Sequence, residues 1–242
     1  MIKKNKFKNE FWAFIPARSG SKGLKNKNIK VINGKPLIYY SLAIALKTQG
    51  IKKTIFSSDS LKYISMAKKF GCRDFHHRSK KFSNDNASEY SVFRNFVDTQ
   101  IKENKILPKY FVHLRTTSPI RKKSTLEKAI KFFKKKNNFT SMRSAHVMSN
   151  PAYRATRIVN GKLCGIMNKN FNIDTFCKPR QFYQDTFRCG LFDIYKTENI
   201  LKGHLWGNKV FPYIIDDIYN DIDTIEDFDL VEYYMKKLKY KI

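Results

Sequence analysis

The sequence has 242 residues, of which 42% are hydrophobic and 14% aromatic, so it is long enough to bury one main hydrophobic core. Its formal net charge is +28, from 48 Lys and Arg against 20 Asp and Glu, a balance that by itself suits a protein that binds nucleic acid or a membrane surface. The lysines are spread over most of the chain, however, and no apolar run approaches the length of a membrane span, so neither a nucleic-acid-binding stripe nor a transmembrane protein is favoured.

Strands and helices alternate through the first half of the chain. The apolar run 11–17 predicts a buried strand that ends in a Gly- and Ser-rich loop, and the helical spacing after Pro36 predicts a helix that ends at Gly50. The same reasoning predicts alternating strands and helices at 53–59, 60–70, 74–78, 88–104 and 110–115, then a helix that starts at a capping-box pattern, Ser124 to Glu127. This order is typical of a Rossmann-like α/β fold, in which helices flank a mostly parallel central sheet and ligands bind at the carboxyl ends of the strands.

The pattern changes at about residue 140, where short strand-like segments and turns begin, among them the strong hairpin signal Asn160-Gly161. The alternation of helices and strands then resumes, with a short helix near 197–201, a strand at 209–216 and a C-terminal helix from about Thr224. We therefore predict a main α/β domain formed by residues 1–139 and 191–242, with a small β-rich inserted subdomain at 140–190.

The cysteines show no pattern of a disulfide framework or a metal site. Cys72, Cys164, Cys177 and Cys189 have no C-x-x-C spacing, and none sits beside a pair of histidines at metal-ligand spacing, as expected for reduced cytosolic thiols. The basic N-terminus leads into an apolar stretch that is too short for the core of a signal peptide. We expect a cytoplasmic protein that does not cross a membrane.

A loop rich in Gly, Ser and Lys follows the first predicted strand. In PARSGSKGLKNKN, residues 16–28, small residues let backbone N–H groups approach phosphate oxygens, while Arg18, Lys22 and Lys27 supply positive charge. The Walker A pattern is absent. Taken alone, the segment suits either a phosphate-binding loop or an ordinary solvated loop.

This segment resembles the signature of the acylneuraminate cytidylyltransferases, the CMP-sialic acid synthetases and their legionaminate and pseudaminate relatives. The resemblance continues, in order, through NGKPLIYYSL, IFSSDS, HHRSKKFSNDNASE, LRTTSPIR, KPRQFY and DIDTIEDF. It implies a nucleotidyltransferase that transfers CMP from CTP to the anomeric hydroxyl of a nine-carbon nonulosonic acid, with pyrophosphate leaving and no covalent enzyme intermediate. Such catalysis rests on alignment of nucleophile and phosphate and on neutralising phosphate charge.

The resemblance assigns the nucleotide site residue by residue. Arg18, Lys22 and Lys27 are implied to hold the triphosphate, with Asn28 in the same loop, and Arg78, Ala87 and Ser88 are implied to bind around the cytosine. For Lys27 the alternative is a solvated loop lysine. For Ser88, as for Asp85, the alternative is that it caps the following helix.

Two carboxylates near the C-terminus are the candidate ligands of Mg²⁺. Alternate residues of an extended segment project to the same side, so Asp221 and Asp223 can converge on one hard cation. The alternative is that Asp223 or Thr224 caps the last helix. Asp59 ends a predicted strand, where its role is ionic, polar or helix-capping.

The resemblance assigns the sugar acid to Arg115, Arg154, Arg180 and Tyr183, since an arginine fork matches a carboxylate. For any single arginine of so basic a chain, the alternative is plain surface charge. Two departures from the family pattern make another nonulosonic acid at least as well supported a substrate as N-acetylneuraminate. Arg115 stands where many members have glutamine, and the asparagine usual before Gly190 is missing.

Two other functions compete with this interpretation. A CMP-Kdo synthetase shares the fold and the reaction, but its first loop fits residues 19–23 poorly. A non-catalytic RNA-binding protein would explain the charge, but the chain lacks an aromatic RNA-binding pattern and a localised basic helix. The resemblance further implies a homodimer, in which the insert packs against the partner and offers it Arg180.

Overall fold

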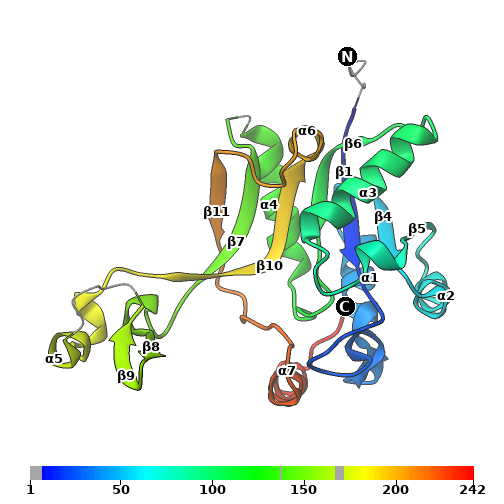
Figure 1. Cartoon of the computed structure of the whole chain (residues 1–242). Helices are drawn as coiled ribbons and strands as arrows, with labels where there is room; N and C mark the ends of the chain where they lie inside the picture. The colour runs from blue at the N-terminus through cyan, green and yellow to red at the C-terminus, as the bar shows by residue number, and fades with distance from the viewer. Residues whose placement is uncertain (1–6, 137, 167–171) are drawn as a thin grey trace.

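A seven-stranded sheet forms the centre of the computed structural model, which describes residues 7–136, 138–166 and 172–242 (Figure 1). In spatial order β11-β7-β10-β6-β1-β4-β5, its strands are β11 (Val210–Ile214), β7 (Ser141–Val147), β10 (Phe187–Lys196), β6 (Pro108–His113), β1 (Lys8–Pro16), β4 (Ile51–Ser58) and β5 (Asp74–His77). Only β10 runs antiparallel to its neighbours within this sheet. The mostly parallel sheet predicted from the sequence is confirmed.

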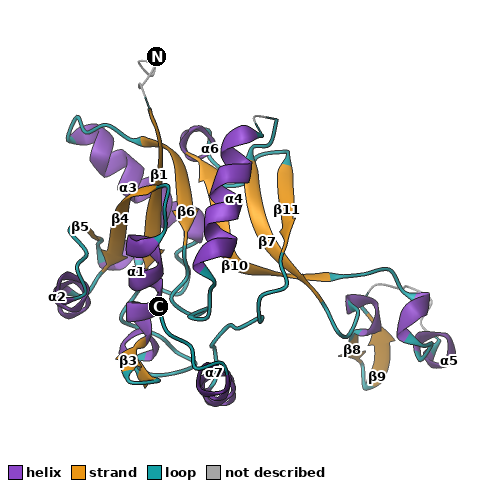
Figure 2. Cartoon of the chain, turned by 180° about the vertical axis from the view of Figure 1, so that it is seen from behind, coloured by secondary structure: helices purple, strands orange, loops and turns teal. Residues whose placement is uncertain are grey.

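Helices cover both faces of the sheet (Figures 1 and 2). The main ones are α1 (Leu37–Lys47), α2 (Leu61–Lys69), α3 (Glu89–Lys102), α4 (Lys123–Lys135), α6 (Thr197–Leu201) and α7 (Ile225–Lys237). Alternate residues of β1 supply the two cores: Ala13 and Ile15 pack with α1, α2 and α4, whereas Trp12 and Phe14 pack with α3. The continuous apolar run of this strand therefore reflects burial on both faces.

Side-chain capping marks the starts of α3 and α7 but not that of α4. Ser88 accepts a hydrogen bond from the backbone of Ser91, and Thr224 forms a capping box with Asp227. The capping box predicted at Ser124 is wrong, because the cap position of α4 is Lys122, two residues earlier, and Glu127 accepts a hydrogen bond from the Gln49 backbone instead (2.8 Å).

An extension leaves the sheet between β7 and β10 (Figure 1). It contains the hairpin β8 (Thr156–Val159) and β9 (Lys162–Gly165), and the short helix α5 (Ile173–Phe176). At the predicted turn, Asn160 and Gly161 both have positive φ, 50° and 73°, as a type I′ hairpin requires. The predicted insert also included β7 and the first residues of β10, but these pair with each other as strands of the central sheet. Between these two strands, the described residues 148–166 and 172–186 lie outside that sheet.

Smaller elements complete the chain. They are the two-stranded ribbon β2 (Val31–Ile32) and β3 (Lys35–Pro36), and the 3-10 helices η1 (Lys27–Ile29), η2 (Lys80–Phe82), η3 (Ala152–Arg154) and η4 (Arg180–Phe182). Among the described residues, no helix has both the length and the apolar character needed to cross a membrane.

A buried arginine joins three elements beneath the carboxyl ends of the strands. Arg121 donates hydrogen bonds to the carbonyls of Leu191 (2.7 Å) and Arg115 (2.6 Å) and to the Ser41 hydroxyl (3.0 Å). Burial lowers its pKa to about 9. These bonds connect α1, β10 and the segment after β6, and so anchor the backbone on which Arg115 stands.

Candidate active site

A cavity of about 360 Å³ opens at the carboxyl ends of β1, β5 and β6. Its walls come from the loop after β1, Arg78, the start of α3, the segment after β6 and Asp223. The lining residues are Pro16, Arg18, Ser21, Lys22, Gly23, Lys27, Asn28, Arg78, Ala87, Glu89, Val92, Phe93, His113, Arg115, Thr116, Thr117 and Asp223. A cavity at this edge is where an open α/β sheet is expected to bind ligands.

Three cations of the loop line this cavity, and each is paired with a carboxylate. Asp85 lies 2.7 Å from Arg18 and 2.6 Å from Lys22, so it bridges both side chains instead of capping α3. Lys27 lies 2.8 Å from Asp223 and donates to the Ile222 carbonyl (2.6 Å). Because these pairs are partly exposed, they contribute little stability and can be exchanged for an anionic ligand.

Asn28 and Gly23 fix the shape of the loop. Asn28 is buried, donates to the Arg18 carbonyl (2.8 Å) and accepts from the Thr116 hydroxyl. A Cβ on Gly23 would lie 2.5 Å from the backbone oxygen of Asp223. Only glycine therefore lets the loop approach Asp223 this closely.

Arg78 is the buried cation of the cavity. Its side chain lines the wall although the residue is only 4% exposed, and burial lowers its pKa to about 10. Within the described part of the chain, its Nε–H has no hydrogen-bond partner. Burying such a charged group is costly, so a ligand acceptor that reaches its guanidinium from the cavity would be favoured here.

Asp59 holds the loop from outside the cavity. Its carboxylate accepts hydrogen bonds from the backbone N–H of Ser19 (2.9 Å) and from the Ser19 hydroxyl (2.7 Å). Burial raises the pKa of Asp59, but the bonds from Ser19 outweigh this effect and hold the pKa below its usual range. Of the roles open for Asp59, the polar one is observed.

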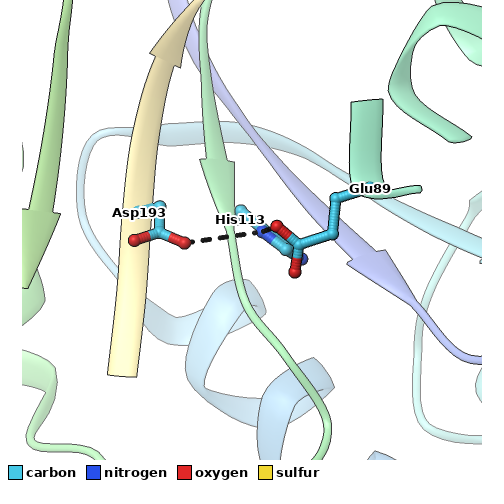
Figure 3. A group of neighbouring side chains, drawn as sticks. All are labelled: Glu89, His113 and Asp193. Atoms are coloured by element: carbon cyan, nitrogen blue, oxygen red, sulfur yellow. Dashed lines mark ion pairs between the residues drawn. The ribbon is translucent and has the colours of Figure 1, made fainter. Parts of the chain in front are cut away.

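A cluster that sequence reasoning missed lies at the other end of the cavity. Figure 3 shows Glu89, His113 and Asp193 converging from α3, β6 and β10. Arg115 lies among them, since its guanidinium is 2.7 Å from Asp193 and 2.7 Å from Glu89. The available signal for this pair was the charged Asp193 within the apolar stretch GLFDIY, together with Arg115 in place of glutamine.

This cluster suits a guanidinium better than a metal ion. One ligand atom from each of Glu89, His113 and Asp193 lies within 4.8 Å of the others, which is close enough to surround a cation. Arg115 already supplies that cation, and burial lowers the pKa of His113, so the ring is neutral. Because two carboxylates hold its fork, Arg115 does not present a free fork to a ligand carboxylate.

Asp221 and Asp223 flank the fully buried Ile222. Asp223 lines the cavity, whereas Asp221 is half-buried and does not. The helix cap is supplied by Thr224, and Asp227 accepts the backbone N–H of Asp223 (3.0 Å), so the Asp223 carboxylate is not used in capping. Of the two predicted Mg²⁺ ligands, Asp223 therefore lies at the cavity, paired with Lys27, and Asp221 lies outside its lining.

The cavity thus brings together Arg18, Lys22, Lys27, Asn28, Arg78, Ala87, Arg115 and Asp223. Ser88 lies outside it as a helix cap. Three residues predicted to bind the sugar acid lie in the extension and do not line it. Arg180 is 3.8 Å from Asp185, Tyr183 stacks on Tyr153 with ring centroids 6.2 Å apart, and Arg154 ends η3.

Comparison of the fold identifies the class. The chain superposes on a CMP:2-keto-3-deoxy-manno-octonic acid synthetase with a TM-score of 0.68 and 16% identity, covering 95% of this chain and 99% of that one. A 4-diphosphocytidyl-2C-methyl-D-erythritol synthase gives a TM-score of 0.64 at 12% identity, with 95% and 100% covered. The fold is therefore that of Rossmann-like nucleotidyltransferases, as expected from the sequence.

Sequence comparison narrows this class. The family model described as cytidylyltransferase matches residues 12–160. A pseudaminic acid cytidylyltransferase of Campylobacter jejuni is 35% identical over 94% of this chain and 95% of its own length. An N-acylneuraminate cytidylyltransferase of Escherichia coli is 28% identical over 95% of this chain, which spans 53% of that longer protein. The chain belongs to the cytidylyltransferase family, as its motifs predicted, and is an enzyme of the nucleotidyltransferase class.

The close approach at Gly23 can be tested directly. In Gly23→Ala the new Cβ would push the loop away from Asp223, and we expect CTP binding, measured by calorimetry, to weaken at least about tenfold. Gly20→Ala is the matched control, because no described atom lies within 4 Å of its new Cβ, and its affinity should stay within about twofold. Equal affinities in the two variants would contradict the importance of this contact.

Proposed function

We propose that the protein transfers CMP from CTP to the anomeric hydroxyl of a nine-carbon nonulosonic acid. The observation that carries the proposal is the cavity that gathers Arg18, Lys22, Lys27 and the unsatisfied Arg78 at the carboxyl ends of the strands. The family supports a cytidine nucleotide as donor. The relatives named for pseudaminic, legionaminic and N-acylneuraminic acids support the acceptor.

In the proposed reaction, the anomeric oxygen attacks the α-phosphorus of CTP. The bond from that phosphorus to the oxygen shared with the β-phosphate breaks, pyrophosphate leaves, and the hydroxyl proton is released to solvent. Arg18, Lys22 and Lys27 exchange their carboxylate partners for phosphate oxygens, whose hydrogen bonds to charged donors are strong. The cations are held near the leaving group before CTP arrives, so little reorganisation is needed.

Arg78 and Glu89 suit the edge of a cytosine. Cytosine has acceptors at O2 and N3 and a donor at its amino group, and a glutamate is a good acceptor for that amino group. Arg78 is a buried donor that lacks an acceptor, which O2 or N3 of cytosine would supply. Glu89 lines the same cavity. Uracil reverses two of these three groups, so CTP is expected to be the preferred donor over UTP.

The reaction can be tested by pyrophosphate release from CTP and Mg²⁺ with N-acetylneuraminate, legionaminate, pseudaminate and Kdo, with products identified by mass spectrometry. We expect a CMP conjugate with at least one nine-carbon acid, and much less product with UTP. Release of pyrophosphate with Kdo alone would show that the acceptor is an eight-carbon acid instead. An absence of CTP binding would exclude the proposed CMP transfer. Salt-dependent RNA binding would then support a nucleic-acid-binding function.

Mg²⁺ is the proposed ion, with Asp221 and Asp223 as its protein ligands. When bound there, it would supply a Lewis acid beside the phosphates. The variants Asp221→Asn and Asp223→Asn should fold normally, but their Mg²⁺-dependent turnover should fall at least about tenfold. Asp229→Asn, on an exposed position of α7, is the control and should keep normal turnover. Unchanged turnover in both site variants would contradict the assignment.

A homodimer built through the extension is the proposed assembly. The extension exposes large apolar side chains, including Ile158 (77%) and Phe182 (69%), and a second copy that covers them would remove apolar surface from water. In this arrangement Arg180 would reach the partner's site. A cytoplasmic location is proposed as well, since CTP is made there and the four cysteines are unpaired.

Light scattering should therefore give about twice the chain mass of 28.5 kDa. Ile158→Asp combined with Phe182→Asp should shift the protein to the monomer, because each adds an unpaired charge to the covered surface. Leu61→Asp is the control, since Leu61 is also 69% exposed but lies on α2. A monomeric wild-type protein with full activity would exclude the dimer.

A further inference from the structure

A second cavity, of about 260 Å³, lies where the extension leaves the sheet. Its walls come from β7 and the residues after it, from β10, and from the segment between β11 and α7. The lining residues are His146, Val147, Met148, Ser149, Asn150, Pro151, Ala152, Ala155, Arg188 and Tyr219. His146 and Arg188 lie directly opposite each other in the β7–β10 ladder, so the sheet itself holds two of the polar groups.

Arg188 gives this cavity an available positive charge. Its guanidinium lies 4.7 Å from the centre of the Tyr219 ring and is exposed, and no carboxylate of the described residues forms an ion pair with it. The stacking on Tyr219 orients the planar fork without using its N–H groups. An oriented fork with free donors is suited to a carboxylate ligand.

His146 adds a second polar group at the same place. The residue is 7% exposed, its ring packs edge-on against Tyr219 with centroids 5.5 Å apart, and neither ring nitrogen forms a hydrogen bond of normal geometry with the described residues. Burial lowers the pKa of His146, so the ring is neutral near pH 7 and has one donor and one acceptor. His146 therefore adds a neutral aromatic ring to the cavity wall beside Arg188.

The second cavity adjoins the first through two shared segments. Tyr219 lines the second cavity and Asp223 lines the first, four residues further along the same segment. In β10, the carbonyl of Gly190 accepts a hydrogen bond from Arg115 of the first cavity (3.3 Å), two residues from Arg188.

Two of the arginines predicted to bind the sugar acid, Arg115 and Arg180, are less available than Arg188. The fork of Arg115 is held by Glu89 and Asp193, and Arg180 is near Asp185 and lines neither cavity. We infer that the second cavity binds the acceptor, a polyhydroxylated sugar acid, and that Arg188 binds its carboxylate. The inference rests on the proposed function. It places the acceptor hydroxyl beside the segment 221–223, toward a nucleotide in the first cavity.

The test compares an acid with its uncharged form. The probe is the nonulosonic acid, among N-acetylneuraminate, legionaminate and pseudaminate, that the wild-type protein uses fastest, together with its methyl ester. Wild-type protein should prefer the acid in kcat/KM at least about tenfold. Arg188→Ala should lose this preference through a higher KM for the acid, while the KM for CTP stays within about twofold. Arg188→Lys should restore part of the preference, because it keeps the charge but not the fork.

Arg157→Ala is the matched control, since Arg157 is exposed on β8 and lines neither cavity. CTP affinity by calorimetry shows whether each variant is folded, and Arg188→Gln replaces the alanine variant if that one unfolds. A normal preference for the acid in Arg188→Ala, or its loss in Arg115→Ala alone, would overturn the inference and leave the cytidylyltransferase intact. A wild-type protein that is inactive with every acid would instead remove the proposed function and this inference with it.

Discussion

The candidate active site depends on positive charge that is held in place by internal carboxylates. Arg18 and Lys22 share Asp85, Lys27 pairs with Asp223, and Arg115 lies between Glu89 and Asp193. Without these partners, several cations around one small cavity would repel one another. The pairs differ in burial: those of the loop are open to solvent and exchangeable, whereas Asp193 is fully buried and holds Arg115 permanently.

Arg78 departs from this arrangement, and its isolation has a structural cause. It follows β5 at the edge of the sheet, where its backbone N–H bonds to Ser58, and its side chain is enclosed by the cavity walls. Asp59 lies near enough to act on its charge, but that carboxylate is engaged by Ser19. The protein thus keeps a buried cation at the cavity wall, at an energetic cost that burial of the hydrophobic cores must offset.

The antiparallel strand β10 gives one sheet two adjacent cavities. At one end, Asp193 reaches the first cavity through Arg115, and at the other, Arg188 lines the second. The register changes between Cys189 and Asp193, and Gly190 there has a φ of 122°, which a residue with a Cβ rarely adopts. This irregularity lies where the strand leaves the sheet toward the extension, next to Arg188 and its contact with Tyr219.

The sequence by itself determined the alternation of strands and helices, the hairpin at Asn160-Gly161, the loop cations and the family, because these depend on local periodicity, turn chemistry and short motifs. Only the tertiary structure decided which charges pair. Asp85 could cap a helix or bridge two cations, and Arg115 could face a ligand or be held by Asp193, 78 residues away. Such choices depend on distances between segments that are remote in the chain, which no local pattern records. For the same reason the sequence did not predict the role of Arg188 or the second cavity, which is formed by β7, β10 and the segment before α7.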